Sequence, residues 1–150
     1  MSKFSTKQFL DSKGRVVYRI EPDKPVLEAL KIMADKNIGA LVVQDAQGRL
    51  VGMLSERDYA RKVILEDKTS AATPVRDIMT AQVISVTEEH SLDDCLNIMS
   101  KHNIRHLPVV KYGKVVGVLG IGELVQQKMQ EKEEEIESLG MYIAGGLPYR

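Results

Sequence analysis

Apolar residues recur at helical spacing in two short segments of this chain, residues 26–33 and 92–99. The repeating positions are Val26, Ala29, Leu30 and Met33 in the first segment and Leu92, Cys95, Leu96 and Met99 in the second. Such spacing places apolar side chains on one face of an α-helix. Asp93 and Asp94 fall in the first turn of the second helix, where the helix dipole favours negative charge. The pattern therefore predicts two amphipathic helices.

Runs of β-branched and other apolar residues surround each predicted helix and predict short strands. The expected strands are residues 16–20, 40–43 and 50–54 in the first half, and 83–86, 107–110 and 115–119 in the second. In each half, the second and third strands flank a glycine-containing turn. Each half is expected to end in a further helix, which begins near Ser55 in the first half and near Gly120 in the second. Both halves are thus predicted to have the order strand, helix, strand, strand, helix.

The two halves are copies of one another. Residues 25–33 align with residues 91–99 at an offset of 66, so that Met33 aligns with Met99. One copy is too small to bury its sheet alone, so we expect two copies to pack face to face about an approximate two-fold axis. A cleft at such a boundary is a favoured place for a ligand. We delimit the repeats as residues 5–70 and 71–128, and a C-terminal helix and tail as 129–150.

Composition narrows the class of protein. Among 150 residues, 21 are Lys or Arg and 21 are Asp or Glu, so the net charge is zero. A nucleic-acid binder that works by bulk attraction to phosphate needs a basic surface, and no membrane-spanning run is present. The first residues lack the apolar core of a signal peptide, and the single cysteine, Cys95, cannot form an internal disulfide. We therefore expect a cytoplasmic protein.

Two motifs carry a resemblance to a known family. Residues 52–58 read GMLSERD and residues 103–110 read NIRHLPVV, and both lie within the ordered repeat. The chain resembles a tandem CBS-domain pair, or Bateman module, over about residues 5–128, and residues 77–80 also resemble the opening segment of a CBS domain. The resemblance implies an α+β fold of two βαββα CBS repeats with pseudo-two-fold symmetry, plus the C-terminal helix. Members of this family bind AMP, ADP, ATP, NAD or S-adenosyl compounds and regulate other proteins.

The resemblance also implies a binding site. The carboxylate of Asp58 would accept hydrogen bonds from both ribose hydroxyls, because a vicinal diol offers two donors. The implied nucleotide-binding residues are Gly52, Ser55, Arg57, Asp58, Thr80, Ile84, Ser85, Val86, Ile104, Arg105, His106, Leu107 and Pro108. A second, weaker site would comprise Arg19, Ile38, Gly39, Ala40, Gly120 and Glu123. It is expected to be weaker because glycine replaces the serine and a longer carboxylate replaces the aspartate.

Less specific interpretations compete with these assignments. Ser55 and Asp58 also form a helix-capping signature, and the same residues can cap a helix and line a cleft. His102 and His106 have a spacing that suggests a metal site, but the following Leu-Pro breaks the helix and no other ligands complete a set, so no metal is expected. Cys95 lies on the apolar stripe and is expected in the core.

The leading functional interpretation is a regulatory sensor of an adenine nucleotide (AMP, ATP or NAD) that signals through relative motion of its repeats. Such a sensor is expected to use no catalytic cofactor and not to be an enzyme. The expected partners are a second copy of the chain, forming a homodimer, and an unidentified regulated protein, with no nucleic acid and no membrane. The alternatives are a ligand-free assembly module and, with less support, a nucleotide-processing enzyme. Residues 141–149 are expected to dock on their own module or on a dimer mate.

Overall fold

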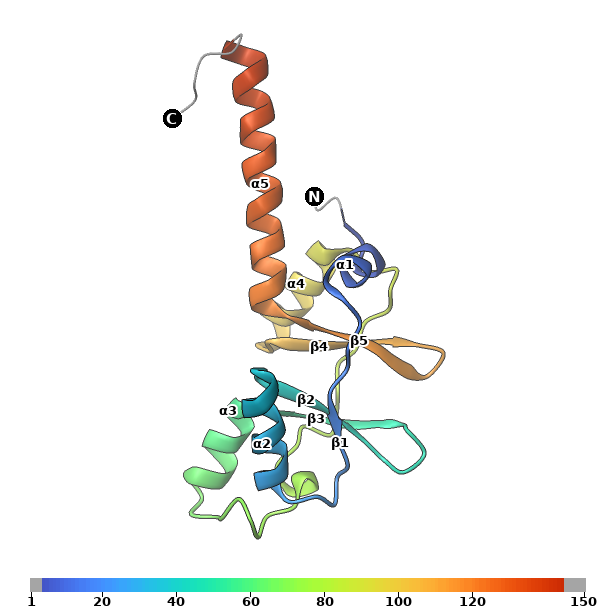
Figure 1. Ribbon diagram of the computed structural model, residues 1–150, viewed down its shortest axis with the longest axis vertical. Coiled ribbons are helices and arrows are strands. Elements are labelled where there is room, and N and C mark those ends of the chain that lie inside the picture. The colour runs from blue at the N-terminus through green and yellow to red at the C-terminus, as the bar shows by residue number, and fades with distance from the viewer. Residues whose placement is uncertain (1–3, 145–150) are drawn as a thin grey trace.

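The computed structural model describes residues 4–144 and the side chains of residues 4–140 (Figure 1). The first repeat contains β1 (Arg19–Ile20), α2 (Val26–Lys36), β2 (Ala40–Gln44), β3 (Leu50–Ser55) and α3 (Glu56–Tyr59), which continues as a π-helical turn (Ala60–Ile64). The second contains α4 (Leu92–His102), β4 (His106–Lys111), β5 (Lys114–Gly120) and α5 (Ile121–Ala144). Helix α1 (Thr6–Lys13) lies at the start of the first repeat, and a 3₁₀ turn (Val75–Asp77) lies at the start of the second. The expected α+β pair with a C-terminal helix is confirmed.

Equivalent residues end the equivalent helices. Helices α2 and α4 stop at Asn37 and Asn103, which adopt left-handed conformations with φ of 55° and 53°. Asparagine tolerates this conformation better than most residues, so each one turns the chain from helix into strand. The repeat seen in the sequence is therefore also a repeat of backbone geometry.

Each repeat forms a small sheet, and the two sheets differ at their first strand. In the first repeat, β1 pairs parallel to β2, which pairs antiparallel to β3. In the second, β4 and β5 pair antiparallel, and the expected strand 83–86 is reduced to one parallel bridge between Val86 and Val109. The difference has a chemical cause. Val42 donates its N–H to Tyr18 in the first repeat, whereas its counterpart Pro108 has no N–H to donate to Ile84.

The segment that opens each repeat packs into the core of the other repeat. Phe9 and Leu10 of α1 are buried with α4, β4 and β5 in the core of the second repeat. Val75 and Ile78 lie at the start of the second repeat in the sequence, yet they are buried in the core of the first. Each core is therefore completed by residues from the other side of residue 70.

A third apolar cluster joins the two sheets. Val42 and Met53 of the first sheet are buried together with Val115 of the second, and residues including Ala40, Val110 and Val118 pack around them. The two sheets thus face each other, as the repeat predicted. Figure 1 shows the halves stacked at this seam.

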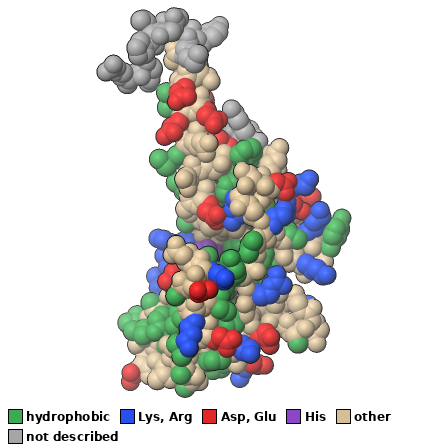
Figure 2. Space-filling view, viewed as in Figure 1, with side chains coloured by type: hydrophobic (Ala, Val, Ile, Leu, Met, Phe, Trp, Pro, Cys, Tyr) green, Lys and Arg blue, Asp and Glu red, His purple; other side chains and the backbone are tan. Residues whose placement is uncertain are grey.

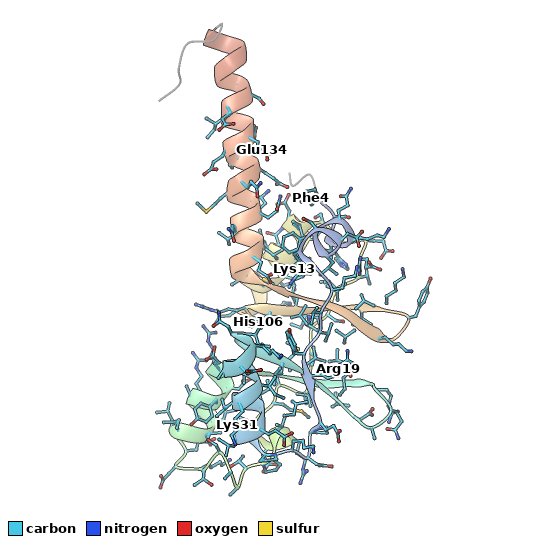
Figure 3. All side chains as sticks on the ribbon, in the orientation of Figure 1. Phe4, Lys13, Arg19, Lys31, His106 and Glu134 are labelled. Atoms are coloured by element: carbon cyan, nitrogen blue, oxygen red, sulfur yellow. The ribbon has the colours of Figure 1, made fainter. Side chains whose placement is uncertain are left out.

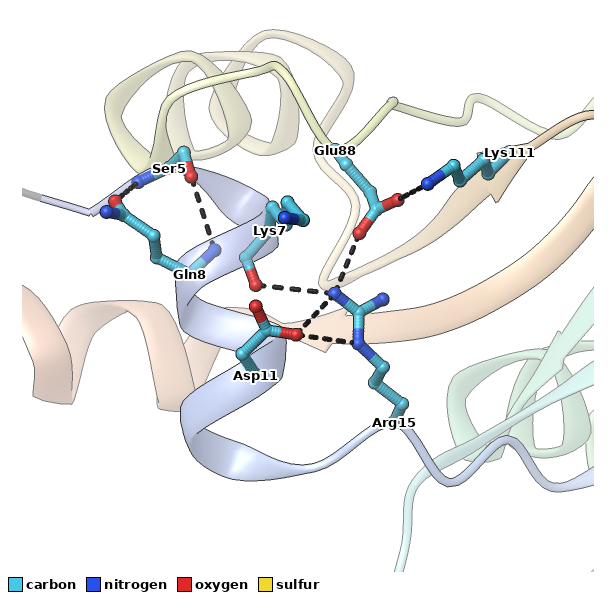
Figure 4. Close-up of polar contacts among 7 residues, drawn as sticks. All are labelled: Ser5, Lys7, Gln8, Asp11, Arg15, Glu88 and Lys111. Carbon is cyan, nitrogen blue, oxygen red and sulfur yellow. Dashed lines mark hydrogen bonds and ion pairs between the residues drawn. The ribbon is translucent and has the colours of Figure 1, made fainter.

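A polar network also anchors α1 to the second repeat (Figure 4). Glu88 is buried, and its carboxylate contacts Arg15 at 2.7 Å and Lys111 at 3.2 Å. Arg15 also pairs with Asp11 at 2.7 Å. The pKa of Glu88 lies below its ordinary value because of hydrogen bonds from Arg15, opposed by desolvation and reinforced by Lys111. The segment that leaves α1 is therefore fixed to the second repeat by charge as well as by apolar contact.

Helix α5 begins at the end of β5 and projects well beyond the two repeats (Figure 1). Leu124 is buried in the second core, whereas Val125, Met129, Ile136 and Leu139 are exposed. Figure 2 shows acidic side chains along the projecting part. No helix within residues 4–144 is long and apolar enough to cross a bilayer. The expected docking of residues 141–149 lies outside the described side chains.

A candidate ligand pocket between the repeats

A pocket of about 570 Å³ opens at the seam, within the size range of small-molecule sites. It is lined by Gly39, Ala40, Met53, Ser55, Glu56, Arg57, Asp58, Arg61, Thr80, Gln82, Val83, Ile84, His102, Asn103, Ile104, Arg105 and His106. These residues come from both repeats and from the segment that joins them. In Figure 3, the labelled His106 lies at the level where the two halves meet.

Asp58 stands on the pocket wall and also caps α3. Ser55 donates its backbone N–H to Asp58 Oδ2 at 3.0 Å and its hydroxyl to the same oxygen at 3.1 Å. In return, Asp58 donates its N–H to Ser55 Oγ at 3.2 Å. The other oxygen, Oδ1, lies 3.4 Å from Lys62 Nζ. The capping interpretation is thus confirmed in the geometry, and the same carboxylate borders the pocket.

Cationic side chains line the same pocket as this carboxylate. Arg57, Arg61 and Arg105 line the pocket together with the two carboxylates of Glu56 and Asp58. Arg57 and Arg61 are four positions apart, and α3 passes into the π-helical turn between them. Insertions of this kind are frequent at functional sites. A guanidinium fork binds phosphate oxygens well, so the pocket combines an acceptor for hydroxyl groups with donors for an anion.

His106 is the half-buried histidine of this pocket. Burial lowers the pKa of its imidazole below the ordinary value of 6.5. The charge of Glu123 opposes this shift, Arg105 reinforces it, and Glu56 opposes it. A Cβ added at Gly39 would lie 3.7 Å from His106 Nε2, so the absence of a side chain there leaves room beside the ring. His106 is therefore neutral near pH 7 and can gain charge when an anion arrives.

The structure brings together part of the set predicted from the sequence. The predicted residues that line the pocket are Ser55, Arg57, Asp58, Thr80, Ile84, Ile104, Arg105 and His106. The predicted residues that do not line it are Gly52, Ser85, Val86, Leu107 and Pro108. Val86 and Leu107 are buried in the second core. Gly52 faces protein instead of the pocket, because a Cβ there would lie 2.5 Å from Met79 Sδ and 3.0 Å from the Thr80 carbonyl oxygen.

Sequence reasoning missed several lining residues. These are Met53, Glu56, Arg61, Gln82, Val83, His102 and Asn103, with Gly39 and Ala40, which were assigned to the second site. Arg61 follows Arg57 by four positions, and this helical spacing is a signal that could have found it. His102 is exposed, as expected, yet it also borders the pocket.

The residues of the predicted second site are distributed over several places. Gly39 and Ala40 line the pocket described above, and Ile38 packs against the first core. Arg19 donates to Gln44 Oε1 at 2.9 Å beside a separate hollow of about 270 Å³. Gly120 and Glu123 lie at the start of α5, where Glu123 forms an ion pair with Lys13. Neither of these two cavities therefore contains all six residues.

The described residues show no built metal site, and their cysteine is buried. No cluster of three or more His, Cys, Asp or Glu side chains within residues 4–140 is arranged to hold a metal ion. Cys95 is fully buried in the second core, as predicted, and burial raises the pKa of its thiol. Its sulfur lies 3.3 Å from Thr6 Oγ1, so this thiol serves the packing of α1 against α4.

Comparison with known proteins agrees with this architecture. The family model described as "CBS domain" matches residues 14–65 and again residues 75–129. The CBS domain-containing protein CBSX3, mitochondrial, of Arabidopsis thaliana is 40% identical over 128 residues, covering 83% of this chain and 62% of the relative. The chain thus spans less than two thirds of that relative's length.

Solved structures show the same fold. The crystal structure of the CBS domain NE2398 has a TM-score of 0.80 and 42% sequence identity, over 83% of this chain and 97% of the other. The CBS domain pair of MJ0100, in complex with 5′-methylthioadenosine and S-adenosyl-L-methionine, has a TM-score of 0.74 and 28% identity, over 85% of this chain and 97% of the other. On the matched family model, the duplicated fold and these relatives, the chain belongs to the CBS-domain family and is a pair of CBS domains.

Proposed function

We propose that this CBS pair is a regulatory module that binds an adenosine-containing nucleotide in the pocket at its seam. The observation that carries the proposal is the placement of the Asp58 carboxylate on the wall of a pocket that also presents Arg57, Arg61 and Arg105. The carboxylate suits a ribose diol, and the guanidinium groups suit phosphates. The relative MJ0100 binds adenosine-containing ligands in its own CBS pair, which supports this ligand class.

Signalling follows from the position of the pocket. Its walls belong to both repeats, so an occupant that contacts both sides favours one relative orientation of the sheets. A regulated protein that prefers this orientation would sense occupancy, and the coupling is limited by the ligand's differential affinity for the two orientations. We assign the chain no catalytic step and place it in a reducing compartment such as the cytoplasm. We also propose that two chains associate as a homodimer.

A pair of capping aspartates tests the binding site. Asp58 and Asp94 each occupy the third position of a helix in a reciprocal capping box, but Asp58 alone of the two lines the pocket. Calorimetry with AMP, ATP, NAD and S-adenosylmethionine, each measured separately, is expected to find a ligand for the wild-type chain. Asp58→Ala should lower affinity for that ligand by about tenfold or more, because a charged hydrogen-bond partner is lost.

Asp94→Ala is the matched control, since it removes the same kind of cap at a distance from the pocket. Its affinity is expected to stay within about twofold of the wild type, although its helix loses a first-turn carboxylate worth about 0.3–1 kcal/mol. Equal losses in both variants would show that the effect comes from capping. Binding of none of the four compounds would favour the ligand-free assembly module, and turnover of any of them would favour an enzyme.

A further inference from the structure

The start of α5 repeats the geometry of the Asp58 position with different residues. Gly120 donates its backbone N–H to Glu123 Oε1 at 3.2 Å, as Ser55 does to Asp58 Oδ2 at 3.0 Å. Glu123 thus folds back on the first turn of its helix in the same way as Asp58. The local backbone for a second carboxylate-based site is therefore present, although it lacks the serine hydroxyl.

A lysine from the other end of the chain occupies this position. Lys13 Nζ lies 3.1 Å from both carboxylate oxygens of Glu123 and 2.8 Å from the carbonyl oxygen of Val118. An ammonium group has three N–H donors, and here each has an acceptor. Both oxygens that a ribose diol would need are thus already engaged.

The lysine takes the place of a main-chain donor found in the first repeat. There, Thr80 donates its N–H to the carbonyl oxygen of Met53 at 2.9 Å. Val118 is the counterpart of Met53, because Met53 pairs with Val42 and Val118 pairs with the equivalent Pro108, and the Val118 carbonyl accepts from Lys13 instead. The two halves therefore differ at equivalent positions: a backbone amide donates to the Met53 carbonyl in the first half, whereas the Lys13 ammonium donates to the Val118 carbonyl and to both oxygens of Glu123 in the second.

The packing of α1 holds this lysine in place. Lys13 is the last residue of α1, and Gly14 ends the helix with φ of 108°. One turn earlier, Leu10 is fully buried against Gly117, where an added Cβ would lie 2.7 Å from the leucine. Lys62 near Asp58 differs, because it contacts one carboxylate oxygen at 3.4 Å from the same helix and has a more exposed side chain than Lys13.

We propose that Lys13 closes the second nucleotide position of this CBS pair, so that the chain binds one nucleotide, and that removal of the lysine opens a weaker second site at Glu123. The inference rests on the function proposed above. It assigns the unequal behaviour of the two halves to an ion pair that joins residues 110 positions apart.

The test is binding stoichiometry, measured by calorimetry and native mass spectrometry, with the nucleotide that the wild-type chain binds among AMP, ATP and NAD. We expect one nucleotide per chain for the wild type and two for both Lys13→Met and Lys13→Gln. Lys13→Arg should remain at one, because it retains the positive charge. Lys7→Met, on the exposed side of the same helix, should also remain at one.

The double variant Lys13→Met/Asp58→Ala identifies the new site, and we expect it to bind one nucleotide more than Asp58→Ala alone at the same nucleotide concentration. A single nucleotide in Lys13→Met and Lys13→Gln, with circular dichroism unchanged, would overturn the inference while leaving the proposed function intact. Two nucleotides on the wild type would also overturn it. Absence of binding in every variant would instead reject the proposed function and the inference with it.

Discussion

At the scale of single residues, the pocket uses side chains that the fold already requires. Asp58 caps α3 through one oxygen, and Glu56 and Arg57 belong to the same short helix. His106 begins β4 and is half-buried by the seam. Since these side chains are positioned by secondary structure, a ligand would meet groups that lose little further freedom on binding.

The lowered pKa of His106 predicts how affinity depends on pH. The imidazole is neutral at pH 7.5, and a bound phosphate favours its protonated form, so binding of an anionic nucleotide takes up a proton. Affinity for ATP or AMP should therefore rise several-fold, within about one order of magnitude, as pH falls from about 7.5 to 5.5. Calorimetry in buffers of different ionisation enthalpy measures the proton uptake.

His106→Gln is expected to flatten this pH dependence, because glutamine fills similar space without titrating. His90→Gln serves as the control, since His90 accepts the Thr87 N–H away from the pocket and its loss should leave the slope unchanged. A slope that persists in His106→Gln would assign the proton to a group other than His106.

Glu88 predicts the acid sensitivity of the fold. Its pKa is lower in the folded chain than the ordinary 4.5, so the unfolded chain binds the proton more tightly. Stability from this group is therefore complete above about pH 4.5 and is lost as pH falls through the folded-state pKa. Urea unfolding between pH 3 and pH 7 should show a steeper loss for the wild type than for Glu88→Gln. The exposed neighbour Glu89→Gln should follow the wild type, and parallel curves for all three proteins would contradict the prediction.

At the scale of elements, periodicity predicted helices α2 and α4 and most strands because these depend on local pattern, whereas helix α1 was not predicted and the first strand is confined to Arg19–Ile20. The strand at 83–86 is shorter than predicted because Pro108 on its neighbour withholds one hydrogen bond, an effect that arises only when the two segments pair. The pocket set was incomplete for a similar reason. Gln82 lines the pocket because the segment after Thr80 crosses the seam, and Arg61 lines it because it lies in the π-helical turn. Lys13 and Glu123 are far apart in the sequence, so their contact arises only from the fold.

Helix α5 provides the prediction for association. Met129 and Ile136 are exposed and seven positions apart, so they lie on one face with Val125 and Leu139, and the acidic residues occupy other faces. If two chains pair through this face, Met129→Glu/Ile136→Glu should convert a dimer to a monomer in light scattering. Gln126→Glu/Gln130→Glu adds the same charge elsewhere on α5 and should leave the mass unchanged. A dimer that survives in the first variant would locate the interface on another surface.

At the scale of the whole molecule, the exchange of opening segments joins the two repeats into one folding unit. Helix α1 completes the second core, and Val75 with Ile78 completes the first. The seam cluster around Val42 and Val115 adds a further connection. Motion between the repeats must therefore be limited to small changes at the seam, because a wide separation would expose both cores. A ligand that contacts both walls of the pocket would shift the relative orientation of the repeats by such small changes.

Two fragments of similar length test this arrangement. A fragment of residues 1–72 contains the first repeat as the sequence order suggests, but it lacks Val75 and Ile78 and carries an unpartnered α1. A fragment of residues 14–80 contains the complete first core. Burial of each missing side chain contributes about 1.5–3 kcal/mol, which is a large share of the stability of so small a unit. The urea midpoint, followed by circular dichroism, is therefore expected to be higher for 14–80 than for 1–72. Equal midpoints would show that the exchanged segments contribute little, and the repeats would then be free to move as separate bodies.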